Sequence, residues 1–301
     1  MLNRIVPKQI FRNKLGVFWV LLLSLSGLIA FAEDAFAEKG ILWRVERSGL
    51  EPSYLLGTAH VSNPEVVDFR PELVRVLTEV DSISLELDLA PANQMRMAGM
   101  LVTPGGNLES QIGSSYFVSL MEEMGKMQIP AEVVQMFKPW AAALAISLPA
   151  DHNPSQAMDM LIYQFALLNN KSIHALETIE EQVAAFENIP LAQQIVFLKL
   201  TIDQLPKRDE LYRRVLDAYL ASDLGLLMKL NDESIAVADK EFIQMFMESL
   251  VYRRNRNMLE GIGPRLVEGN ALVAVGALHL PGNKGLLSLL RNEGFTLSPV
   301  Y

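Results

Sequence analysis

Near one end the chain reads YLLGTAHV at residues 54–61, and near the other it reads VGALHLPG at residues 275–282. Each stretch is an apolar run that ends in glycine, with a histidine three positions after the glycine. In open α/β sheets the chain turns sharply after a strand, and the next side chains project into the crevice at the carboxyl ends of the strands. The repeated G-x-x-H spacing therefore predicts an α/β fold in which His60 and His279 share one site.

The residues around these two stretches alternate between strand and helix patterns. Apolar alternation and short β-rich runs predict strands at residues 41–46, 53–57, 82–89, 171–176, 270–276 and 295–300. Apolar residues at i, i+3 and i+4 predict helices over most of residues 108–150 and 191–266. The alternation predicts one α/β domain over residues 38–301, a mixed sheet of short strands with a large helical insertion, at about residues 91–266, that forms a cap.

The first 37 residues have the pattern of an export signal. Four basic residues precede a nearly uncharged apolar run at residues 15–32, and small-residue sites suited to signal peptidase end at Ala32 and Ala37. The alternative is an uncleaved membrane anchor, because about 18 apolar residues just reach the length that spans a bilayer. We expect a cleaved signal peptide over residues 1–37 and a periplasmic or secreted protein, which meets the membrane only through this segment if it is retained.

Charge and cysteine content narrow the classes of function. Without the four basic and two acidic side chains of residues 1–37, the chain keeps 22 basic and 33 acidic residues. An acidic surface repels phosphate backbones, and no basic run interleaved with aromatics appears, so we expect no nucleic-acid partner. The chain has no cysteine, which excludes disulfides, thiolate nucleophiles and cysteine-type zinc sites. Composition leaves the oligomeric state open.

A metal site at the two histidines would need a carboxylate, because two imidazoles alone hold an ion weakly. Glu86 is the best candidate, since it lies late in an otherwise apolar strand, where an unpaired charge is costly. Glu177 follows a predicted strand in the same way. Asp88 and Asp159 have equally good structural interpretations, because carboxylates at such positions often accept backbone N–H bonds or pair with arginine.

The remaining histidines and the main basic cluster have mostly structural interpretations. His152 lies in a predicted loop and His174 inside a predicted strand, so both are expected to be structural. The cluster RRNRN at residues 253–257 lies late in a predicted helix, where basic residues usually form a solvated face favoured by the helix dipole. One of its arginines could instead point inward and hold a carboxylate or a developing oxyanion.

Signatures of several competing chemistries are absent from the sequence. It contains no G-x-S-x-G elbow, no G-x-x-x-x-G-K-[ST] loop, no G-x-G-x-x-G at a helix start and no H-E-x-x-H helix. The histidine pair is therefore the best candidate for a site that carries chemistry.

Six short motifs occur in the order typical of one protein family. They are YLLGTAHV at 54–61, LELD at 85–88, KPW at 138–140, LET at 176–178, RNM at 256–258 and VGALHLPG at 275–282. Each motif is weak alone, but the ordered set, from about residue 41 to residue 301, resembles the TraB/GumN family. One departure is at residues 157–159, Ala-Met-Asp, where the family often has glycine-x-aspartate at the start of a helix.

The resemblance implies a metal-dependent hydrolase. The family includes the Tiki-type proteases, described as acting through two G-x-x-H motifs and a glutamate, and its fold is related to that of erythromycin-esterase-like hydrolases. Carried over to this sequence, it implies His60, Glu86 and His279 as metal ligands, with Glu177 and Arg256 as supporting residues.

These observations lead to one main hypothesis and two alternatives. The main hypothesis is a periplasmic or secreted peptidase that uses a divalent Mn, Co or Zn ion and acts on a peptide or protein substrate. In it Glu177 serves as general base or further ligand, and Arg256 steadies a carboxylate or the oxyanion. The first alternative is a non-catalytic peptide-binding protein whose groove is lined by methionines such as Met245 and Met247. The second is a small-ester hydrolase that uses the same site.

Overall fold

The sheet has the mixed α/β character predicted from the sequence. A computed structural model of the chain describes residues 38–235 and 240–301, so the predicted signal peptide lies outside the described residues. Within the described part, six short strands form one sheet in the order β4-β3-β5-β2-β1-β6. The strands are β1 (Leu42–Glu46), β2 (Ser53–Thr58), β3 (Ser82–Leu85), β4 (Ser172–Ala175), β5 (Ala271–Gly276) and β6 (Thr296–Pro299).

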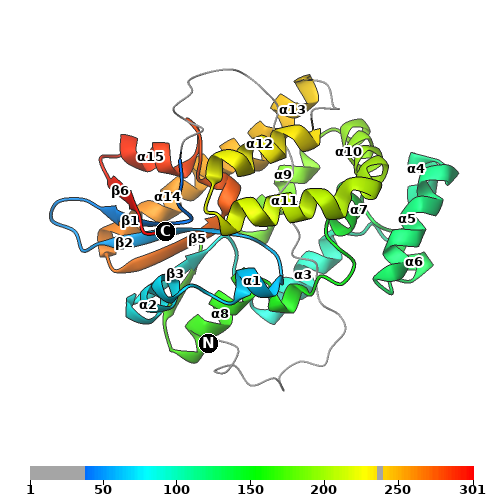
Figure 1. Ribbon diagram of the computed structural model, residues 1–301. Helices are drawn as coiled ribbons and strands as arrows, with labels where there is room; N and C mark the ends of the chain where they lie inside the picture. Colours follow the sequence, from blue (N-terminus) through cyan, green and yellow to red (C-terminus); the bar gives the residue numbers. More distant parts are fainter. Residues whose placement is uncertain (1–37, 236–239) are drawn as a thin grey trace.

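Four neighbouring strands of this sheet run in the same direction. β2 and β3 both pair in parallel with β5, and β4 pairs in parallel with β3. β1 forms an antiparallel hairpin with β2 and pairs antiparallel with β6 at the sheet edge. The carboxyl ends of β2, β3, β4 and β5 therefore meet at one edge, where Figure 1 shows the chain passing into the helical part of the molecule.

The central strand β5 is buried along its whole length. All six of its residues are buried, and so are the four residues of β3. Strands that are buried on both faces in this way occur where helices cover both sides of a parallel sheet. The strand predicted over residues 82–89 ends at Leu85, because Leu85 is its last residue paired with both neighbours and the chain turns away at Glu86.

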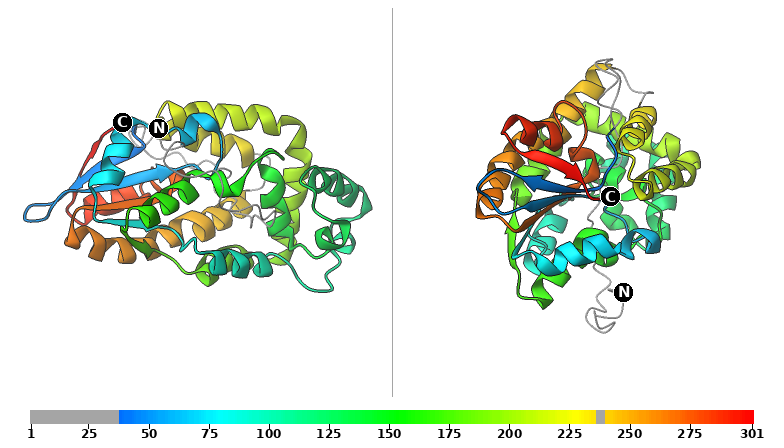
Figure 2. Two further views of the ribbon diagram at one scale, coloured as in Figure 1. Left: turned by 90° about the horizontal axis from the view of Figure 1, so that it is seen from below. Right: turned by 60° about the vertical axis from the view of Figure 1, so that its left-hand side comes forward.

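Helices cover the two faces because the crossovers run in opposite directions from the middle of the sheet. α2 (Pro71–Glu79) leads from β2 to β3 and α8 (Met158–Leu168) from β3 to β4, while α14 (Arg253–Glu268) leads back from β4 to β5. Right-handed crossovers then place α2 and α8 on one face, and α14 with α15 (Leu286–Asn292) on the other. The contacts of α2 with α8 and of α14 with α15 agree with this arrangement, which Figures 1 and 2 show.

The chain that follows β5 thus leaves toward the opposite face from the chains that follow β2 and β3. A strand whose neighbours diverge in this way marks a topological switch point of an open α/β sheet. Ligands bind in the crevice at such points, so the topology singles out the carboxyl end of β5 and the residues beside it.

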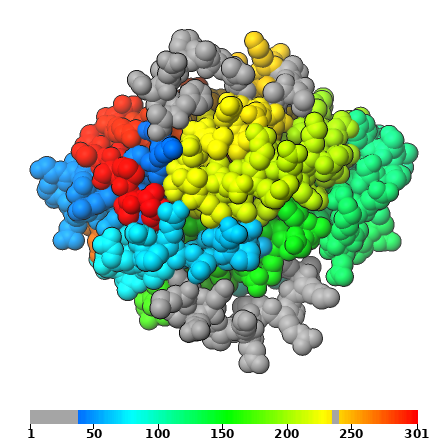
Figure 3. All heavy atoms as spheres, viewed as in Figure 1, coloured from blue at the N-terminus to red at the C-terminus, as the bar shows by residue number. Residues whose placement is uncertain are grey.

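The remaining helices extend beyond the carboxyl edge and form the predicted cap, and the stretch 91–266 returns to the sheet once, at β4. They are α1 (Pro64–Val67), α3 (Pro91–Met100), α4 (Leu108–Ile112), α5 (Ser114–Lys126), α6 (Ala131–Val134), α7 (Pro139–Ser147), α9 (Ile179–Glu187), α10 (Leu191–Gln204), α11 (Arg208–Leu220), α12 (Leu224–Ile235) and α13 (Lys240–Met247). Figure 2 shows α4, α5 and α6 at the end of the molecule farthest from the β1–β2 turn. In Figure 3, α11 and α12 form a continuous surface between that end and the sheet.

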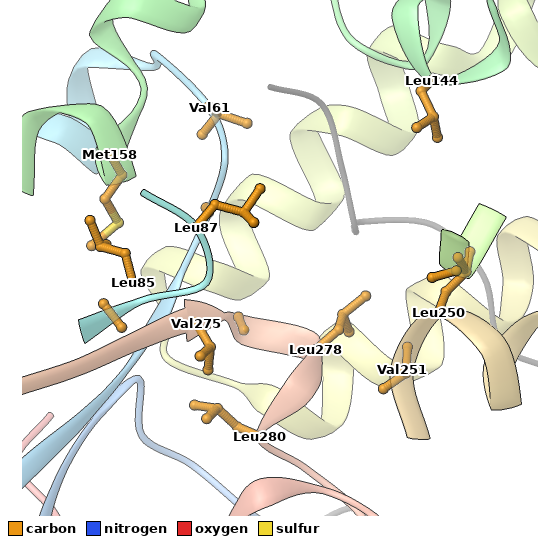
Figure 4. Packing of buried hydrophobic residues seen from close by; sticks show 14 of the residues in the cluster. Val61, Leu85, Leu87, Leu144, Met158, Leu250, Val251, Val275, Leu278 and Leu280 are labelled. Carbon is orange, nitrogen blue, oxygen red and sulfur yellow. The ribbon is translucent and has the colours of Figure 1, made fainter. Parts of the chain in front are cut away.

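One hydrophobic core joins the sheet to the cap. Figure 4 shows Leu85, Val275, Leu278 and Leu280 around the strand ends, with Leu250 of the helical region beside them. No helix in residues 38–235 and 240–301 is long and apolar enough to cross a membrane.

The methionines of the helical region mostly belong to this core. Met124, Met247 and Met258 are buried, and Met245 is partly buried against the core. Met245 and Met247 therefore pack against other helices in the core. They do not line an exposed groove, so the methionine-rich pattern reflects core packing.

Candidate functional site

The two G-x-x-H histidines and Glu86 come together at the carboxyl edge of the sheet. His60 follows β2 by two residues, Glu86 follows β3 directly, and His279 ends the short 3-10 helix η6 (Ala277–His279) after β5. The Nε2 atom of His60 lies 3.9 Å from Glu86 Oε1, and the Nε2 atom of His279 lies 3.8 Å from the same oxygen. Three residues from three neighbouring strand ends thus face one point.

The glycines of both motifs have steric roles in this meeting. A Cβ atom on Gly57 would lie 2.8 Å from Leu280 Cδ1 and 3.0 Å from the backbone of Ala277, so this glycine lets the two motifs pack directly against each other. A Cβ atom on Gly276 would lie 3.2 Å from His60 Nε2 and 3.3 Å from Glu86 Oε1. The missing side chain of Gly276 therefore leaves open the space between the candidate ligands.

His60 is oriented by a carboxylate from α8. Its Nδ1 atom lies 2.7 Å from Asp159 Oδ2, while Thr58 donates a hydrogen bond to Asp159 Oδ1 at 2.7 Å. Burial lowers the pKa of His60, but the charges of Asp159 and Glu86 and the hydrogen bond outweigh it and raise the pKa to about 9. Asp159 keeps the proton on Nδ1, which leaves Nε2 directed toward Glu86.

His279 is held in the same way by an amide. The side-chain oxygen of Asn255 lies 2.6 Å from His279 Nδ1, so it accepts the Nδ1 proton and fixes the tautomer with a free lone pair on Nε2. Burial, with the charge of Arg254, lowers the pKa of His279 to about 3, so the ring is neutral. Its Nε2 atom is fully buried and has no hydrogen-bond partner among the described residues.

Glu86 is kept ionised by three donors. Oε1 accepts a hydrogen bond from the backbone N–H of Gly276 at 2.6 Å, and Oε2 accepts from Arg254 at 2.6 Å and from Gln182 at 3.1 Å. Burial raises the pKa of Glu86, but the guanidinium of Arg254 and the other contacts outweigh it and hold the pKa well below its usual range. A fixed, charged carboxylate results, with Oε1 turned toward both histidines.

The supporting arginine is Arg254, not the predicted Arg256. Arg254 is 3% exposed and donates to both oxygens of Glu177, at 3.0 Å and 2.7 Å, as well as to Glu86. Arg256 is 51% exposed and pairs with Glu248 on the surface, so its predicted contact with the site is wrong. The carboxylate of Glu177 joins the site through Arg254, which occupies both of its oxygens, and the backbone N–H of Glu177 donates to the carbonyl oxygen of Glu86 at 2.9 Å.

A local irregularity explains the choice of arginine. A π-helical turn, η5 (Glu248–Tyr252), directly precedes α14, and such turns shift the helical register by one residue. The two adjacent residues Arg254 and Asn255 are consequently both buried and both face the site. The sequence cluster at 253–257 does indicate an inward arginine, but nothing in its spacing indicates the π-turn.

The other candidates lie outside this group. Asp88 accepts hydrogen bonds from the backbone N–H of Ala90 and from Asn93, so it holds the turn that leads into α3, in line with its structural interpretation. His152 lies 3.2 Å from Ser62 Oγ, and His174 lies beside the guanidinium of Arg265.

A pocket opens beside the three central residues. The pocket is partly open to solvent, and His60, Glu86, Asp159 and Gln182 lie in its wall, whereas His279 is fully buried behind it. Glu177 and Arg254 do not line it. The histidine–glutamate cluster is therefore accessible from one side and supported by buried residues on the other.

A comparison with models of known protein families shows which family the chain belongs to. The sequence model of the TraB/PrgY/gumN family matches residues 41–299. The chain belongs to this family. The match spans both G-x-x-H motifs and every residue described above, so the family and the site cover the same part of the chain.

The curated proteins that this TraB/PrgY/gumN member resembles are distant relatives. It is 24% identical to a protein of Amphimedon queenslandica named metalloprotease TIKI homolog, over 98% of this chain and 68% of that protein. It is 23% identical to metalloprotease TIKI1 of Danio rerio, over 84% of this chain and 62% of that protein. It is 23% identical to the uncharacterized protein YbaP of Shigella flexneri, over 81% of this chain and 89% of that protein. No solved structure matches the chain.

The metalloprotease relatives imply a metal ion, and the central residues of this family member offer suitable donors. The unpartnered Nε2 of buried His279 and the gap above Gly276 are the features a metal site requires, and both imidazoles have the outer hydrogen bond usual for histidine ligands. In the described ranges, 38–235 and 240–301, no three His, Asp or Glu side chains already stand in metal-binding geometry. His60 Nε2 and His279 Nε2 lie 3.9 Å and 3.8 Å from Glu86 Oε1, so these donors would have to move closer together to hold one ion.

Proposed function

We propose that this TraB/PrgY/gumN protein is a metal-dependent hydrolase that cleaves peptide bonds, with His60, His279 and Glu86 as the metal ligands. The observation that carries the proposal is the buried, unpartnered Nε2 of His279, which faces the same oxygen of Glu86 as His60 Nε2 does, and both His60 and Glu86 line an accessible pocket. A bound Mn, Co or Zn ion would supply Lewis acidity and a water acidified toward neutral pH.

The residues of the chain prepare the site for such an ion. Asp159 and Asn255 lie beside the Nδ1 atoms of the two histidines, so that both Nε2 atoms face inward; a bound ion would replace the Nε2 proton that the raised pKa of about 9 leaves on His60 in the metal-free protein. Arg254 keeps Glu86 charged and fixed, and Glu177 in turn holds Arg254. Glu177 is thus better placed as a positioning residue than as the general base, because no oxygen of it reaches the pocket wall.

Location and partners belong to the same proposal. The apolar segment at residues 15–32, followed by small-residue sites, supports export to the periplasm or the exterior. The names of the metalloprotease relatives support a peptide or protein substrate, and the acidic charge of the chain is unfavourable for a nucleic-acid partner.

Metal analysis of the purified protein tests the ligand assignment. We expect about one equivalent of a divalent ion in the wild type, on the basis of one three-residue ligand set. His60→Ala and His279→Ala should each lose the ion while the far-UV circular dichroism spectrum is unchanged. His174→Ala is the matched control, because His174 lies beside Arg265, and it should keep the metal. A wild type that binds no divalent ion would sink the mechanism.

A cleavage screen tests the reaction. The metal-loaded protein is incubated with a peptide library and with a panel of small esters, with and without chelator. Peptide cleavage that chelator abolishes supports the proposal, and chelator-sensitive cleavage of esters alone replaces it with the ester-hydrolase alternative. If no peptide or ester is cleaved under any metal, and peptide binding persists in His60→Ala and His279→Ala, the non-catalytic alternative is supported.

A further inference from the structure

The pocket beside the candidate metal site has a strongly divided lining. Its four polar residues, His60, Glu86, Asp159 and Gln182, contact one another and form one cluster. The other fourteen lining residues are apolar, including Leu87, Leu89 and Leu101. We propose that this pocket binds a large apolar side chain of a peptide substrate next to the bond that is cleaved. The inference rests on the proposed function and names its substrate class.

The shape of the pocket comes from α7 and α9. Trp140 of α7 and Phe186 of α9 stack with ring centroids 4.7 Å apart and form a flat aromatic wall. Ala141 and Ala145, one helical turn apart on α7, also line the pocket, and their small side chains leave room that larger residues would fill. A lining of apolar residues with a few polar groups at one place is typical of sites for ligands with substantial apolar groups.

The pocket offers no free counter-charge to an ionised side chain of a substrate. His60, Glu86 and Asp159 are the charged or titratable residues in the pocket wall, and each already has a partner in the cluster. A lysine or aspartate side chain in the apolar part would therefore be desolvated without a counter-charge, which is strongly unfavourable. Leucine, methionine and phenylalanine side chains carry no such cost and gain from burial.

Trp140 adds one polar feature to the apolar wall. The residue is buried, yet its indole N–H has no hydrogen-bond partner among the described residues. A buried tryptophan N–H usually has a partner. An occupant that brings a carbonyl oxygen into the pocket supplies the missing acceptor, as the backbone of a peptide does and a simple hydrocarbon does not.

Binding to the chelated protein tests the pocket independently of catalysis. The probe is N-phenyl-1-naphthylamine, an uncharged dye that fluoresces in apolar surroundings. We expect one saturable dye site per chain, and Ala145→Leu should weaken its binding about tenfold, the factor that corresponds to about 1.4 kcal/mol. Ala92→Leu adds the same bulk at an exposed position of α3 and should leave dye binding unchanged. Equal dye binding in the wild type and Ala145→Leu overturns the proposal.

Displacement of the dye by peptides identifies the occupant. In the series acetyl-Gly-Gly-X-Gly-Gly-amide, X as Leu or Phe should displace the dye at about tenfold lower concentration than X as Asp or Lys. Trp140→Phe should weaken displacement by the peptides while dye binding remains. Equal displacement by all peptides, or stronger displacement by octanoyl-glycinamide than by the Leu and Phe peptides, overturns the assignment to a peptide side chain.

Cleavage by the metal-loaded protein separates this inference from the proposed function. Cleavage that prefers X as Leu or Phe, and loses that preference in Ala145→Leu, supports both. Metal-dependent cleavage with no preference at X overturns the inference and leaves the proposed function standing. Selective binding of apolar peptides with no cleavage under any metal supports the pocket and contradicts the proposed hydrolysis.

Discussion

Arg254 and Asn255 are consecutive residues whose side chains serve opposite sides of one cluster: Arg254 binds Glu86, and Asn255 binds His279. Neighbouring residues of a regular α-helix point about 100° apart, since the helix has 3.6 residues per turn. The π-turn η5 sets the start of α14 at the angle where both side chains face inward. One short segment therefore orients both a carboxylate and an imidazole of the candidate metal site.

Removal of Arg254 should destabilise the fold. Arg254→Ala leaves the carboxylates of Glu86 and Glu177 buried without their counter-charge, and breaking a buried pair in this way costs about 3–5 kcal/mol. Arg256→Ala breaks an exposed pair with Glu248 and should cost less than about 1 kcal/mol. Urea unfolding of the two variants measures the difference. Equal losses in both would show that the buried network contributes no more than the surface pair.

Asn255 should tune metal affinity through His279. Asn255→Leu removes the acceptor that fixes the tautomer of His279, and loss of such an outer contact typically lowers metal affinity about 10–100-fold. Asn255 also donates to the carbonyl oxygens of His279 and Lys284, so some loss of stability accompanies the change. Zinc titration with a competing chelator measures the affinity. Asn257→Leu, at an exposed position of the same helix, is the control, and an equal affinity in both variants contradicts the assigned role.

The gap above Gly276 should be required for metal binding. Gly276→Ala places a Cβ atom 3.2 Å from His60 Nε2 and 3.3 Å from Glu86 Oε1, so the donors must move apart. We expect the variant to fold and to lose bound metal. Gly99→Ala introduces the same atom in α3 with nothing within 4 Å, and should add up to about 1 kcal/mol of stability through helix propensity. Full metal occupancy in Gly276→Ala would contradict the proposed position of the ion.

The stability of the metal-free protein should fall as pH rises from 6.5 to 9. Because the folded state raises the pKa of His60 from 6.5 to about 9, its ion pair with Asp159 is fully present below pH 6.5 and is lost as pH rises through 9. Asp159→Asn removes the main cause and should flatten this dependence. Urea midpoints at several pH values, with chelator present, measure the slope.

A separate acidic window provides a check on that experiment. The pKa values of His152 and His279 are lowered, to about 4 and about 3, mainly by burial, so their effect on stability lies below pH 6.5. Both must gain a buried charge on acidification, which lowers stability toward acid pH. Asp159→Asn should leave this loss of stability at acid pH unchanged. If Asp159→Asn removes the pH dependence of stability both below pH 6.5 and between pH 6.5 and 9, or removes it in neither range, the assignment of the upper range to His60 is contradicted.

Local sequence patterns predicted much of the sheet and the centre of the site. The apolar runs before Gly57 and Gly276 are strands β2 and β5, and the G-x-x-H spacing does bring His60 and His279 to one point. Glu86 was predicted from the cost of an unpaired charge in an apolar strand, and in the structure Arg254 pairs with it. These predictions succeed because each depends on a strand and the few residues that follow it.

The other residues of the site depend on helix register and on contacts between residues far apart in the sequence, which local patterns do not show. The choice of Arg254 over Arg256 follows from a π-turn five residues long, which apolar spacing does not reveal. Gln182 and Asn255 come from helices far apart in sequence, and neither carries a distinguishing motif. Asp159 was left between two interpretations because its contact with His60 spans ninety-nine positions. The pocket likewise depends on how α7 and α9 pack, which requires the tertiary structure.

The position of β5 has a consequence for how the protein becomes functional. In space β5 lies between β2 and β3, but it is made only after residues 86–270 have been added to the chain. Until β5 inserts, the loops that carry His60 and Glu86 have no partner between them, and His279 is absent. Long-range strand pairing of this kind is slow, because loop closure precedes any gain from contact. A growing or partly folded chain therefore lacks the assembled candidate site, and a truncation before residue 279 keeps His60 and Glu86 but leaves out the second histidine.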